Sequence, residues 1–468
     1  MKHTLAVSLF LTILAGNTTG NAMARNTTIS GVAPSYAGKT ISLRTYAEQV
    51  LNEEEELSQA KVEKDGAFKF EVNIDSPIQV FIPNDVTKAF IYLEPGATYD
   101  ITLPDYQERT LPEKLNPYFK PSDVLAPINN LKRGDFNYQM MEFEDAFDFY
   151  TMKHITYGAH PDSVKKSIGQ LKAMFTDLKN PYQVRFKEYR YALLHNMCVS
   201  NHQQQLDSVI IRLNNIGVDY ENPAFWDAFN NIFVDFIRNS SGSEEYELFK
   251  RIVATNDAKM LMRMLGERYK ISVKLLRELA AIKIVGELVE FPVFDRSQII
   301  VMLQSLGSVI SDQGNRELLQ AMINKVSVNY IGTPAPDFEA RDTNGNLVKL
   351  SDFRGKFVYL NFGNSNLEKT IRDLQVLRRF HDSYQNSLVI MNVFLFDDVE
   401  TVKRLEKVHQ KQMLFLTTPV SDAVRHAYDL KNTPSYLLID KEGNFLMTKG
   451  TEPNDELRLF LQNTLNLK

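Results

Sequence analysis

Cysteine is nearly absent from this chain of 468 residues, which contains one copy, at Cys198. A single cysteine cannot form a disulfide within the chain. Cys198 stands beside Leu194 and Met197 on a predicted helix, which favours a buried structural thiol. A reactive thiol that pairs with another chain is the alternative. His195-x-x-Cys198 has metal-like spacing, but no second pair of ligands accompanies it in the sequence, so no metal site is predicted.

An excess of basic residues is also missing. The chain has 53 Lys and Arg against 58 Asp and Glu, a formal charge of −5. This balance argues against nucleic acid as a partner, because binding to phosphate backbones needs a basic surface. After the first residues no apolar run is long enough to cross a bilayer. H-E-x-x-H, phosphate-loop, dinucleotide-binding and G-x-S-x-G motifs are absent as well, and no cofactor is predicted.

What is present begins with a predicted secretion signal in residues 1–24. Lys2 opens the segment, the run LAVSLFLTILAG forms a short apolar centre, and AMA at 22–24 fits a small-x-small cleavage site. No cysteine lies near that site, so a lipid anchor is not expected. We therefore expect an exported, periplasmic protein without a membrane span.

The region 25–111 is predicted to be a β-sandwich. Its segments are short and rich in β-branched and aromatic residues, and Asp65-Gly66 between two alternating runs indicates a hairpin. In the second of these runs, apolar side chains are predicted on one face and polar ones on the other. The apolar set is Phe68, Phe70, Val72 and Ile74, and the polar set is Lys69, Glu71 and Asn73.

The region 112–328 is predicted to be a helical bundle. Asn180-Pro181 and Asn222-Pro223 each place a capping residue before a proline suited to the first helical position. Aromatic residues recur after both at the spacing of a helix, which indicates core stripes rather than a ligand groove. No repeat of fixed period is present, so a solenoid is not favoured.

The region 329–468 alternates strands with amphipathic helices, the pattern of an α/β domain. Its opening, IGTPAPDFEARDTNGNLVKLSDFRGKFVYLNF, resembles the thioredoxin-like family of envelope thiol–disulfide oxidoreductases and redoxins. NTPSYLLIDKEGNF is similar to that family's cis-proline turn, at Thr433-Pro434, and closing hairpin. The resemblance implies a thioredoxin-like fold. VEKDGAFKFEV and IYLEPGATYDITL in the first region resemble the small β-sandwich domain of unknown function that precedes thioredoxin domains in many Gram-negative envelope proteins.

The resemblance fails at the redox centre. Family members carry Cys-x-x-Cys where the strand meets its helix, whereas Leu367 and Thr370 stand at those two positions here, with Asn366 in place of a tryptophan. Disulfide exchange needs a thiolate and a second, resolving thiol. Neither leucine nor threonine supplies one. The family's redox activity is therefore not expected, and no catalytic residues are assigned.

A structural role for this stretch is also predicted. Ser365-x-x-Glu368 has the spacing of a capping box at the start of a helix. An apolar stripe and a polar face follow along that helix. The stripe is Leu367, Ile371, Leu374, Leu377 and Phe380, and the polar residues are Glu368, Lys369, Arg372, Asp373 and Arg379.

A binding role is the sharper hypothesis. Asn364, Ser365 and Asn366, with Thr370, form a polar group at this junction. Glu368 in the first helical turn opposes an anion. In the family, the backbone beside the cis-proline pairs with an extended substrate chain, so the resemblance implies a peptide site that includes Thr433 and Pro434.

These observations favour a binding or scaffold protein of the bacterial envelope that is not an enzyme, with an unidentified protein or peptide partner. One alternative is an enzyme: a thiol–disulfide oxidoreductase acting through Cys198 or a partner's thiol, or a hydrolase in the helical region. A purely architectural role within a larger complex is the other. The sequence indicates no oligomeric state.

Overall fold

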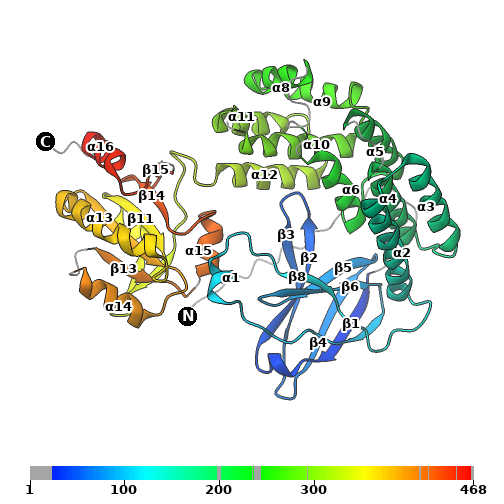
Figure 1. Cartoon of the computed structure of the whole chain (residues 1–468), viewed down its shortest axis with the longest axis horizontal. Helices are drawn as coiled ribbons and strands as arrows, with labels where there is room; N and C mark the ends of the chain where they lie inside the picture. The colour runs from blue at the N-terminus through cyan, green and yellow to red at the C-terminus, as the bar shows by residue number, and fades with distance from the viewer. Residues whose placement is uncertain are drawn as a thin grey trace.

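The structure is a computed structural model of the whole chain. It describes residues 24–197, 202–234, 236, 244–291, 293–409, 413–419, 421–448 and 451–464, with the side chains of 202–208 and 245 excepted. Cys198 and the predicted leader, apart from Ala24, lie outside these residues. Figure 1 shows a strand-rich region, a helical region and a mixed C-terminal region in chain order. The predicted fold class is confirmed.

The strand-rich region consists of two sheets with a shared core. A three-stranded sheet has the order β4-β1-β7, and a five-stranded sheet has the order β3-β2-β5-β6-β8. Apolar side chains from both sheets, such as Phe70 and Ile91, form one buried cluster. The strands are β1 (Arg25–Val32), β2 (Thr40–Glu48), β3 (Glu53–Lys61), β4 (Ala67–Ile74), β5 (Ile78–Pro83), β6 (Thr87–Leu93), β7 (Thr98–Ile101) and β8 (Ser122–Leu125).

Alternation in β4 follows the prediction. Phe68, Phe70 and Val72 are buried and Ile74 packs partly against the core, while Lys69, Glu71 and Asn73 are exposed. The predicted hairpin at Asp65-Gly66 is wrong, because β4 pairs with β1 and β3 pairs with β2. The turn carries the chain from one sheet to the other. Gly66 has a φ of 88°, and a Cβ there would lie 2.8 Å from the Pro34 nitrogen, so glycine is required.

The sheets extend beyond residue 111. β8 pairs in parallel with β6, and an isolated bridge joins Ile101 to Ile128. The connection between β7 and β8 contains a short helix, α1 (Leu111–Leu115). Pairing with the strands of the sandwich therefore continues to Ile128. A further turn, η1 (Pro34–Tyr36), follows β1.

The helical region packs around buried aromatic side chains. Asn222 and Asn180 accept hydrogen bonds from the main-chain N–H groups two residues ahead, as predicted for caps. Phe225, Phe229 and Phe233 are fully buried. The helices are α2 (Phe136–Tyr157), α3 (Pro161–Met174), α4 (Pro181–Met197), α5 (His202–Ile216), α6 (Pro223–Phe233), α8 (Glu244–Thr255), α9 (Ala258–Glu267), α10 (Lys274–Glu287), η2 (Leu288–Glu290), α11 (Arg296–Leu306) and α12 (Gln313–Ser327).

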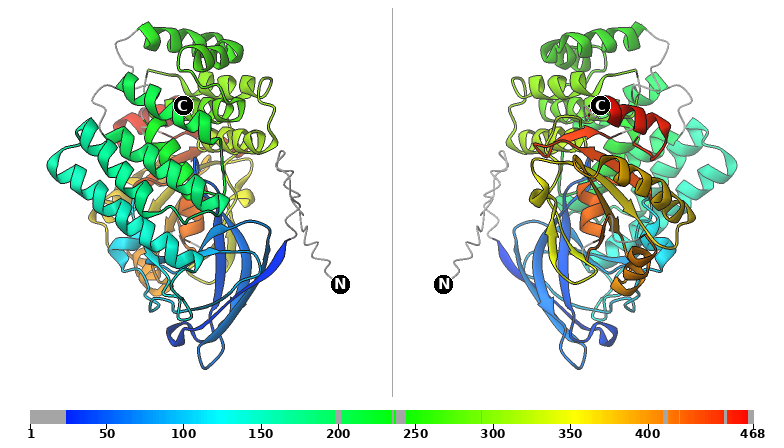
Figure 2. Two further views of the ribbon diagram at one scale, coloured as in Figure 1. Left: turned by 90° about the vertical axis from the view of Figure 1, so that its right-hand side faces the viewer. Right: turned by 90° about the vertical axis from the view of Figure 1, so that its left-hand side faces the viewer.

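Tyr92 of β6 joins the sandwich to the helical core. Its ring is 7% exposed and lies 6.2–6.3 Å, centroid to centroid, from the rings of Phe136, Tyr182 and Phe186. The Asn137 amide donates to the Tyr92 carbonyl at 2.8 Å and accepts from the Tyr92 N–H at 3.1 Å. The two regions therefore share buried apolar surface, as their close packing in Figures 1 and 2 also indicates.

The C-terminal region has a mixed seven-stranded sheet of order β10-β9-β13-β12-β11-β14-β15. β11, β12 and β13 are parallel, while β14 runs antiparallel to β11. Separate apolar clusters cover the two faces of the sheet. The elements are β9 (Glu339–Asp342), β10 (Leu347–Lys349), η3 (Leu350–Phe353), β11 (Phe357–Gly363), α13 (Glu368–Tyr384), β12 (Leu388–Phe394), α14 (Val399–Val408), β13 (Leu414–Thr417), α15 (Ser421–Ala427), β14 (Ser435–Ile439), β15 (Phe445–Met447) and α16 (Asp455–Thr464).

None of the helices in the described residues combines the length and the apolarity needed to cross a bilayer.

Candidate functional site

The candidate site lies where β11 ends and α13 begins. β11 is an inner strand of the C-terminal sheet, between β12 and β14, and the turn 364–367 follows its last residue. Asn364 is fully buried; its amide donates to the Leu395 carbonyl at 2.6 Å and its Oδ1 accepts from the Asn366 N–H at 3.0 Å. Asn364 therefore fixes the turn from inside, and Ser365 and Asn366 are the members of the predicted polar group that reach the surface.

The predicted capping box is wrong. α13 begins at Glu368, its N-cap is Leu367, and no side chain caps it. Ser365 instead turns toward Asp397, which follows β12. The carboxylate of Asp397 accepts from the Ser365 N–H at 2.8 Å and from its hydroxyl at 2.5 Å. The serine is therefore held by a neighbouring turn and is not available to cap the helix.

Asp397 is the residue that sequence reasoning missed. β11 and β12 are parallel, with Gly363 opposite Phe394, so the turns that follow them share one edge of the sheet. An acidic residue shortly after the second strand was the available signal. Burial raises the pKa of Asp397, although the hydrogen bonds from Ser365 act in the opposite direction.

Leu367 and Thr370, the two positions that the resemblance assigns to the cysteine motif, differ in exposure. Leu367 is half-buried at the helix start, whereas Thr370 is fully buried. The Thr370 hydroxyl accepts from the Asn364 N–H at 3.4 Å. A Cβ at Gly363 would lie 2.5 Å from the Thr370 methyl group, so the glycine makes room for the threonine. The side chains of Leu367 and Thr370 are at least partly buried, and neither carries a group that reacts with a disulfide.

Thr433 and Pro434 lie at the same edge. Their peptide bond is cis, as the sequence predicts. β14 runs antiparallel to β11, and their ladder ends with Phe362 opposite Ser435. The start of β14 therefore faces the end of β11, and the Thr433 main chain lies beyond the last paired residue. The structure brings together all five residues of the predicted binding set, Asn364, Ser365, Asn366, Thr433 and Pro434.

A buried polar cluster lies beneath the first turns of α13. Asp373, predicted to be exposed, is 7% exposed and accepts a hydrogen bond from the Tyr436 hydroxyl. The Lys369 ammonium reaches Asp373 at 3.0 Å, Tyr436 at 3.2 Å and Glu452 at 3.5 Å. The prediction failed because β14 supplies a hydroxyl opposite the helix. The cluster ties α13 to β14 on the side of the helix away from Ser365.

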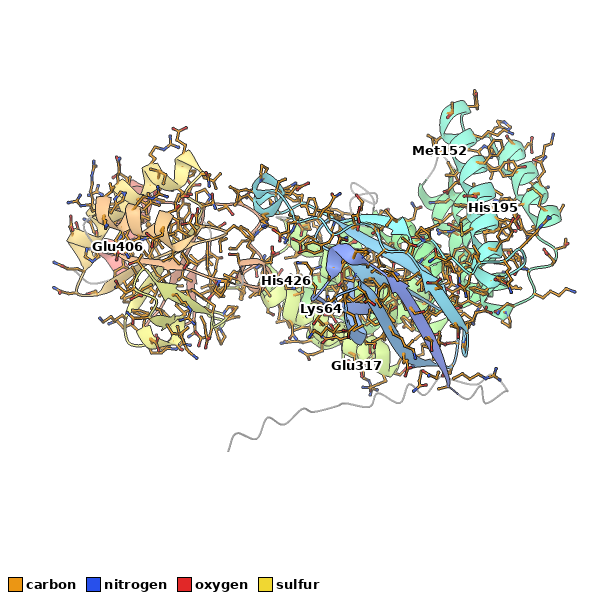
Figure 3. The ribbon with its side chains drawn as sticks, turned by 90° about the horizontal axis from the view of Figure 1, so that it is seen from below. Lys64, Met152, His195, Glu317, Glu406 and His426 are labelled. Carbon is orange, nitrogen blue, oxygen red and sulfur yellow. The ribbon has the colours of Figure 1, made fainter. Side chains whose placement is uncertain are left out.

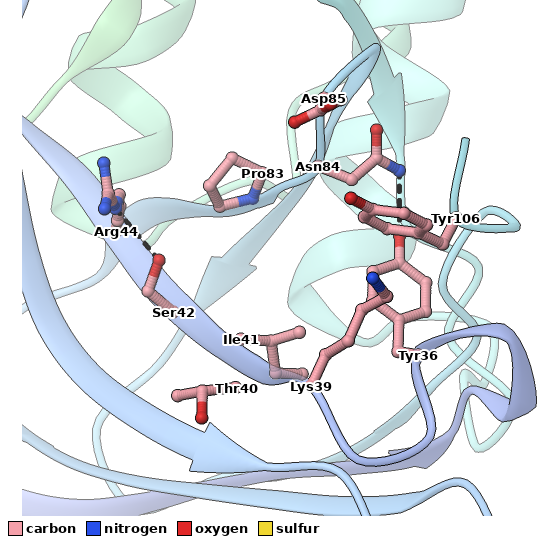
Figure 4. Close-up of a pocket in the computed structure, with 10 residues that line it drawn as sticks. All are labelled: Tyr36, Lys39, Thr40, Ile41, Ser42, Arg44, Pro83, Asn84, Asp85 and Tyr106. Carbon is pink, nitrogen blue, oxygen red and sulfur yellow. Dashed lines mark hydrogen bonds between the residues drawn. The ribbon is translucent and has the colours of Figure 1, made fainter. Parts of the chain in front are cut away.

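A hollow lies in the sandwich, with a volume of about 290 Å³. Figure 4 shows Tyr36, Lys39, Asn84, Asp85 and Tyr106 among its lining side chains. The Asn84 amide donates to the Tyr36 hydroxyl at 2.8 Å, and the Lys39 ammonium lies 3.9 Å from the centroid of the Tyr106 ring. These contacts stabilise the walls. The sequence offered no signal for this hollow, because its lining comes from segments far apart in the chain.

The described residues contain no group of three or more His, Cys, Asp or Glu side chains placed to hold a metal ion. His195, part of the His-x-x-Cys spacing, is half-buried. Its pKa is lowered to about 4 by burial and by the nearby charges of Arg212 and Lys172. The histidine is therefore neutral at pH 7, as expected for a side chain packed within the bundle.

Comparison with known proteins adds to this geometry. Residues 331–446 match the AhpC/TSA family. The chain is similar to the thiol-disulfide oxidoreductase ResA of Geobacillus thermodenitrificans, 28% identical over 137 residues that make up 28% of this chain and 76% of the relative. ResA of Bacillus thuringiensis subsp. konkukian is 24% identical over 167 residues, or 35% of this chain and 93% of the relative.

Solved structures overlap the same part of the chain. The thioredoxin domain of a thiol-disulfide oxidoreductase from Bacteroides vulgatus is 21% identical, with a TM-score of 0.26, over 28% of this chain and 97% of that chain. A thiol:disulfide interchange protein from Bacteroides sp. is 21% identical, with a TM-score of 0.27, over 30% of this chain and 91% of that chain.

The C-terminal region is thus a thioredoxin-like redoxin domain related to thiol-disulfide oxidoreductases, and the predicted resemblance is confirmed. At the motif positions this chain reads Leu367-Glu368-Lys369-Thr370.

Proposed function

We propose that this protein is an exported, periplasmic binding module whose thioredoxin-like domain takes an extended peptide or protein segment without redox chemistry. The observation that carries the proposal is the meeting of two chain segments at one sheet edge. Ser365 and Asn366 lie in the turn after β11, and Thr433 lies just before β14, the strand paired with β11. This edge contains the polar groups of a binding site but no sulfur.

An extended peptide suits this edge better than a small anion. The Thr433 main chain lies past the β11–β14 ladder, where an added segment can pair with it by β-strand addition. Glu368, with 92% of its side chain exposed, stands in the first turn of α13 and opposes anion binding at that helix start. Asp397 lies behind Ser365. Their negative charge favours a neutral or basic peptide.

Site-specific crosslinking in intact cells tests this proposal. A photoreactive residue is placed at Asn366, and the matched control carries it at Arg379, which is exposed further along the same helix. We expect a defined set of envelope proteins to be captured from position 366 and not from 379. Thr433→Arg should reduce the capture, because a long cationic side chain would cover the pairing edge. Equal capture from both positions, or capture that Thr433→Arg leaves unchanged, would contradict the proposal.

A thiol–disulfide oxidoreductase acting through Cys198 or a partner's thiol is the second candidate. The names of the relatives favour it, since both are thiol-disulfide oxidoreductases. The rate of exchange with a mixed-disulfide substrate would be compared between the parent and Cys198→Ser. A rate above background that falls in the variant would support this candidate, and background rates in both would exclude the Cys198 route.

A further inference from the structure

The segment 104–119 runs between the sandwich and the C-terminal domain and is called the docking segment here. It includes α1, which lies beside α15 (Figure 1). Seen from below, His426 of α15 lies between the C-terminal domain, marked by Glu406, and the sandwich, marked by Lys64 (Figure 3). This segment therefore occupies the junction between the C-terminal domain and the rest of the chain.

One side of the docking segment is attached to the sandwich. The Tyr36 hydroxyl donates to the Pro104 carbonyl at 3.0 Å, and the Tyr106 N–H donates to the Ser35 hydroxyl at 3.0 Å. The Arg109 N–H lies 3.4 Å from the Asp85 carboxylate. Tyr106 and Asp85 also line the hollow of Figure 4. These contacts make the segment a fixed part of the sandwich surface.

The other side contacts the C-terminal domain through charged groups. The Arg109 guanidinium donates to both carboxylate oxygens of Asp422, at 2.5 and 3.4 Å. Arg425 donates to the Lys114 carbonyl. Within the C-terminal domain, the Arg425 guanidinium lies 5.8 Å from the centroid of the Phe396 ring, a cation–π contact. Both cations that hold this interface are therefore arginines, one from each side.

These contacts leave the interface poorly balanced. Burial lowers the pKa of Arg425 and the charge of Arg109 lowers it further, while the charge of Asp422 acts in the opposite direction. The Nε atoms of both arginines are buried without a hydrogen-bond partner. Asp422 is 53% exposed, so water and salt reach the ion pair and weaken it. In the described residues, no buried apolar cluster contains residues from both sides of this interface.

The docked surface adjoins the candidate site. The Phe396 N–H donates to the Ser421 hydroxyl at 3.0 Å, which joins the turn after β12 to α15. The next residue, Asp397, holds Ser365. Helix α15, which the docking segment contacts, is therefore joined to the turn that carries Asp397 at the candidate site.

We propose that α15 forms a docking surface that binds residues 104–119 reversibly, so that the C-terminal domain separates from the sandwich when the Arg109–Asp422 pair and the Arg425–Lys114 hydrogen bond break. The inference does not depend on the proposed function, because it concerns the position of a domain and not the capture of a ligand at residue 366.

Small-angle X-ray scattering of the full chain tests the reversibility. We expect the radius of gyration to rise with salt. Arg109→Gln should lower the ratio of docked to separated molecules by up to about fivefold, the range for an exposed ion pair. Asp422→Asn should lower it further, because it leaves Arg109 and Arg425 facing each other without a carboxylate. Asp429→Asn is the matched control, since Asp429 pairs with Lys431 outside the interface at 2.6 Å.

Exchanging the charges of Arg109 and Asp422 separates an effect on the ion pair from an effect on folding. Arg109→Asp should enlarge the particle, and Arg109→Asp with Asp422→Arg should restore the compact form. The proposal is wrong if the double variant is no more compact than Arg109→Asp, or if all single variants match the wild type at every salt concentration.

A binding measurement tests the surface itself. A fluorescent peptide of residues 104–119 is added to the full-length Arg109→Asp variant, whose Asp422 and Arg425 remain in place. We expect tighter binding than to the wild type, where the resident segment competes, and weaker binding of a peptide that carries Asp at position 109. Equal binding of both peptides would contradict recognition of Arg109 by this surface.

Discussion

Two interfaces connect the sandwich to the rest of the molecule, and they differ in chemistry. The interface with the helical region buries Tyr92 among three aromatic rings and satisfies its main chain through Asn137. The interface with the C-terminal domain depends on Arg109, Asp422 and Arg425. Buried apolar area stabilises strongly, whereas exposed ion pairs contribute little. The sandwich and helical regions therefore form one body, and the C-terminal domain is attached to that body by a weaker contact.

The largest expected effect is at the apolar interface. Tyr92→Ala should lower the free energy of unfolding by about 3–5 kcal/mol, because it leaves a cavity among aromatic side chains. The measurement is urea unfolding followed by circular dichroism. Tyr118→Ala is the control, since Tyr118 is 71% exposed. Equal effects of the two substitutions would mean that Tyr92 does not join the two regions.

The second effect tests whether the C-terminal domain unfolds separately. Gly363→Ala should destabilise that domain by about 1–3 kcal/mol, because the new Cβ meets the Thr370 methyl group. We expect only the transition of the C-terminal domain to shift. Thr370→Ser removes that methyl and keeps the hydroxyl, so the double variant should recover much of the loss. If the double variant is no more stable than Gly363→Ala, the contact with the Thr370 methyl group is not the cause of the destabilisation.

At the polar interface the expected change in stability is smaller. Arg109→Gln should lower the free energy of unfolding by less than about 1 kcal/mol, because its partner is half exposed. Denaturation in low and high salt provides the measurement, and the difference from the wild type should shrink as salt screens the pair. A loss as large as that of Tyr92→Ala would remove the contrast between the interfaces.

The smallest expected effect concerns pH. The pKa of Asp397 is raised above its ordinary value of 3.8, mainly by burial. The folded state then holds this proton more tightly than the unfolded state. The resulting stability is fully present below pH 3.8 and is lost as pH rises through the raised pKa. Asp397→Asn should lack this dependence in unfolding measurements between pH 3 and 7. A wild type that gains stability relative to the variant with rising pH would show that the pKa is lowered.

Local patterns predicted the elements well, and contacts between distant segments account for the errors. The alternating pattern correctly predicted that Phe68, Phe70 and Val72 are buried, because successive side chains of a strand point to opposite faces of the sheet. The residues Asp65-Gly66 suit a hairpin turn, but β4 pairs with β1, so the strand after the turn belongs to the other sheet.

The candidate site shows the same division. The Thr433-Pro434 turn and the polar residues of 364–366 could be found by resemblance. The roles of Asp397 and Tyr436 could not be found from the sequence, because their partners, Ser365 and Asp373, lie on other elements. The spacing of a capping box describes what Ser365 can do alone, and the carboxylate of Asp397 offers it two stronger, charged hydrogen bonds.

The rate of insulin disulfide reduction by the purified full chain, with dithiothreitol as the reductant, tests the central claim most directly. If the chain acts as the proposed binding module, the rate should equal that of dithiothreitol alone, in both the parent and Cys198→Ser. Turnover well above that background in either protein would contradict the account.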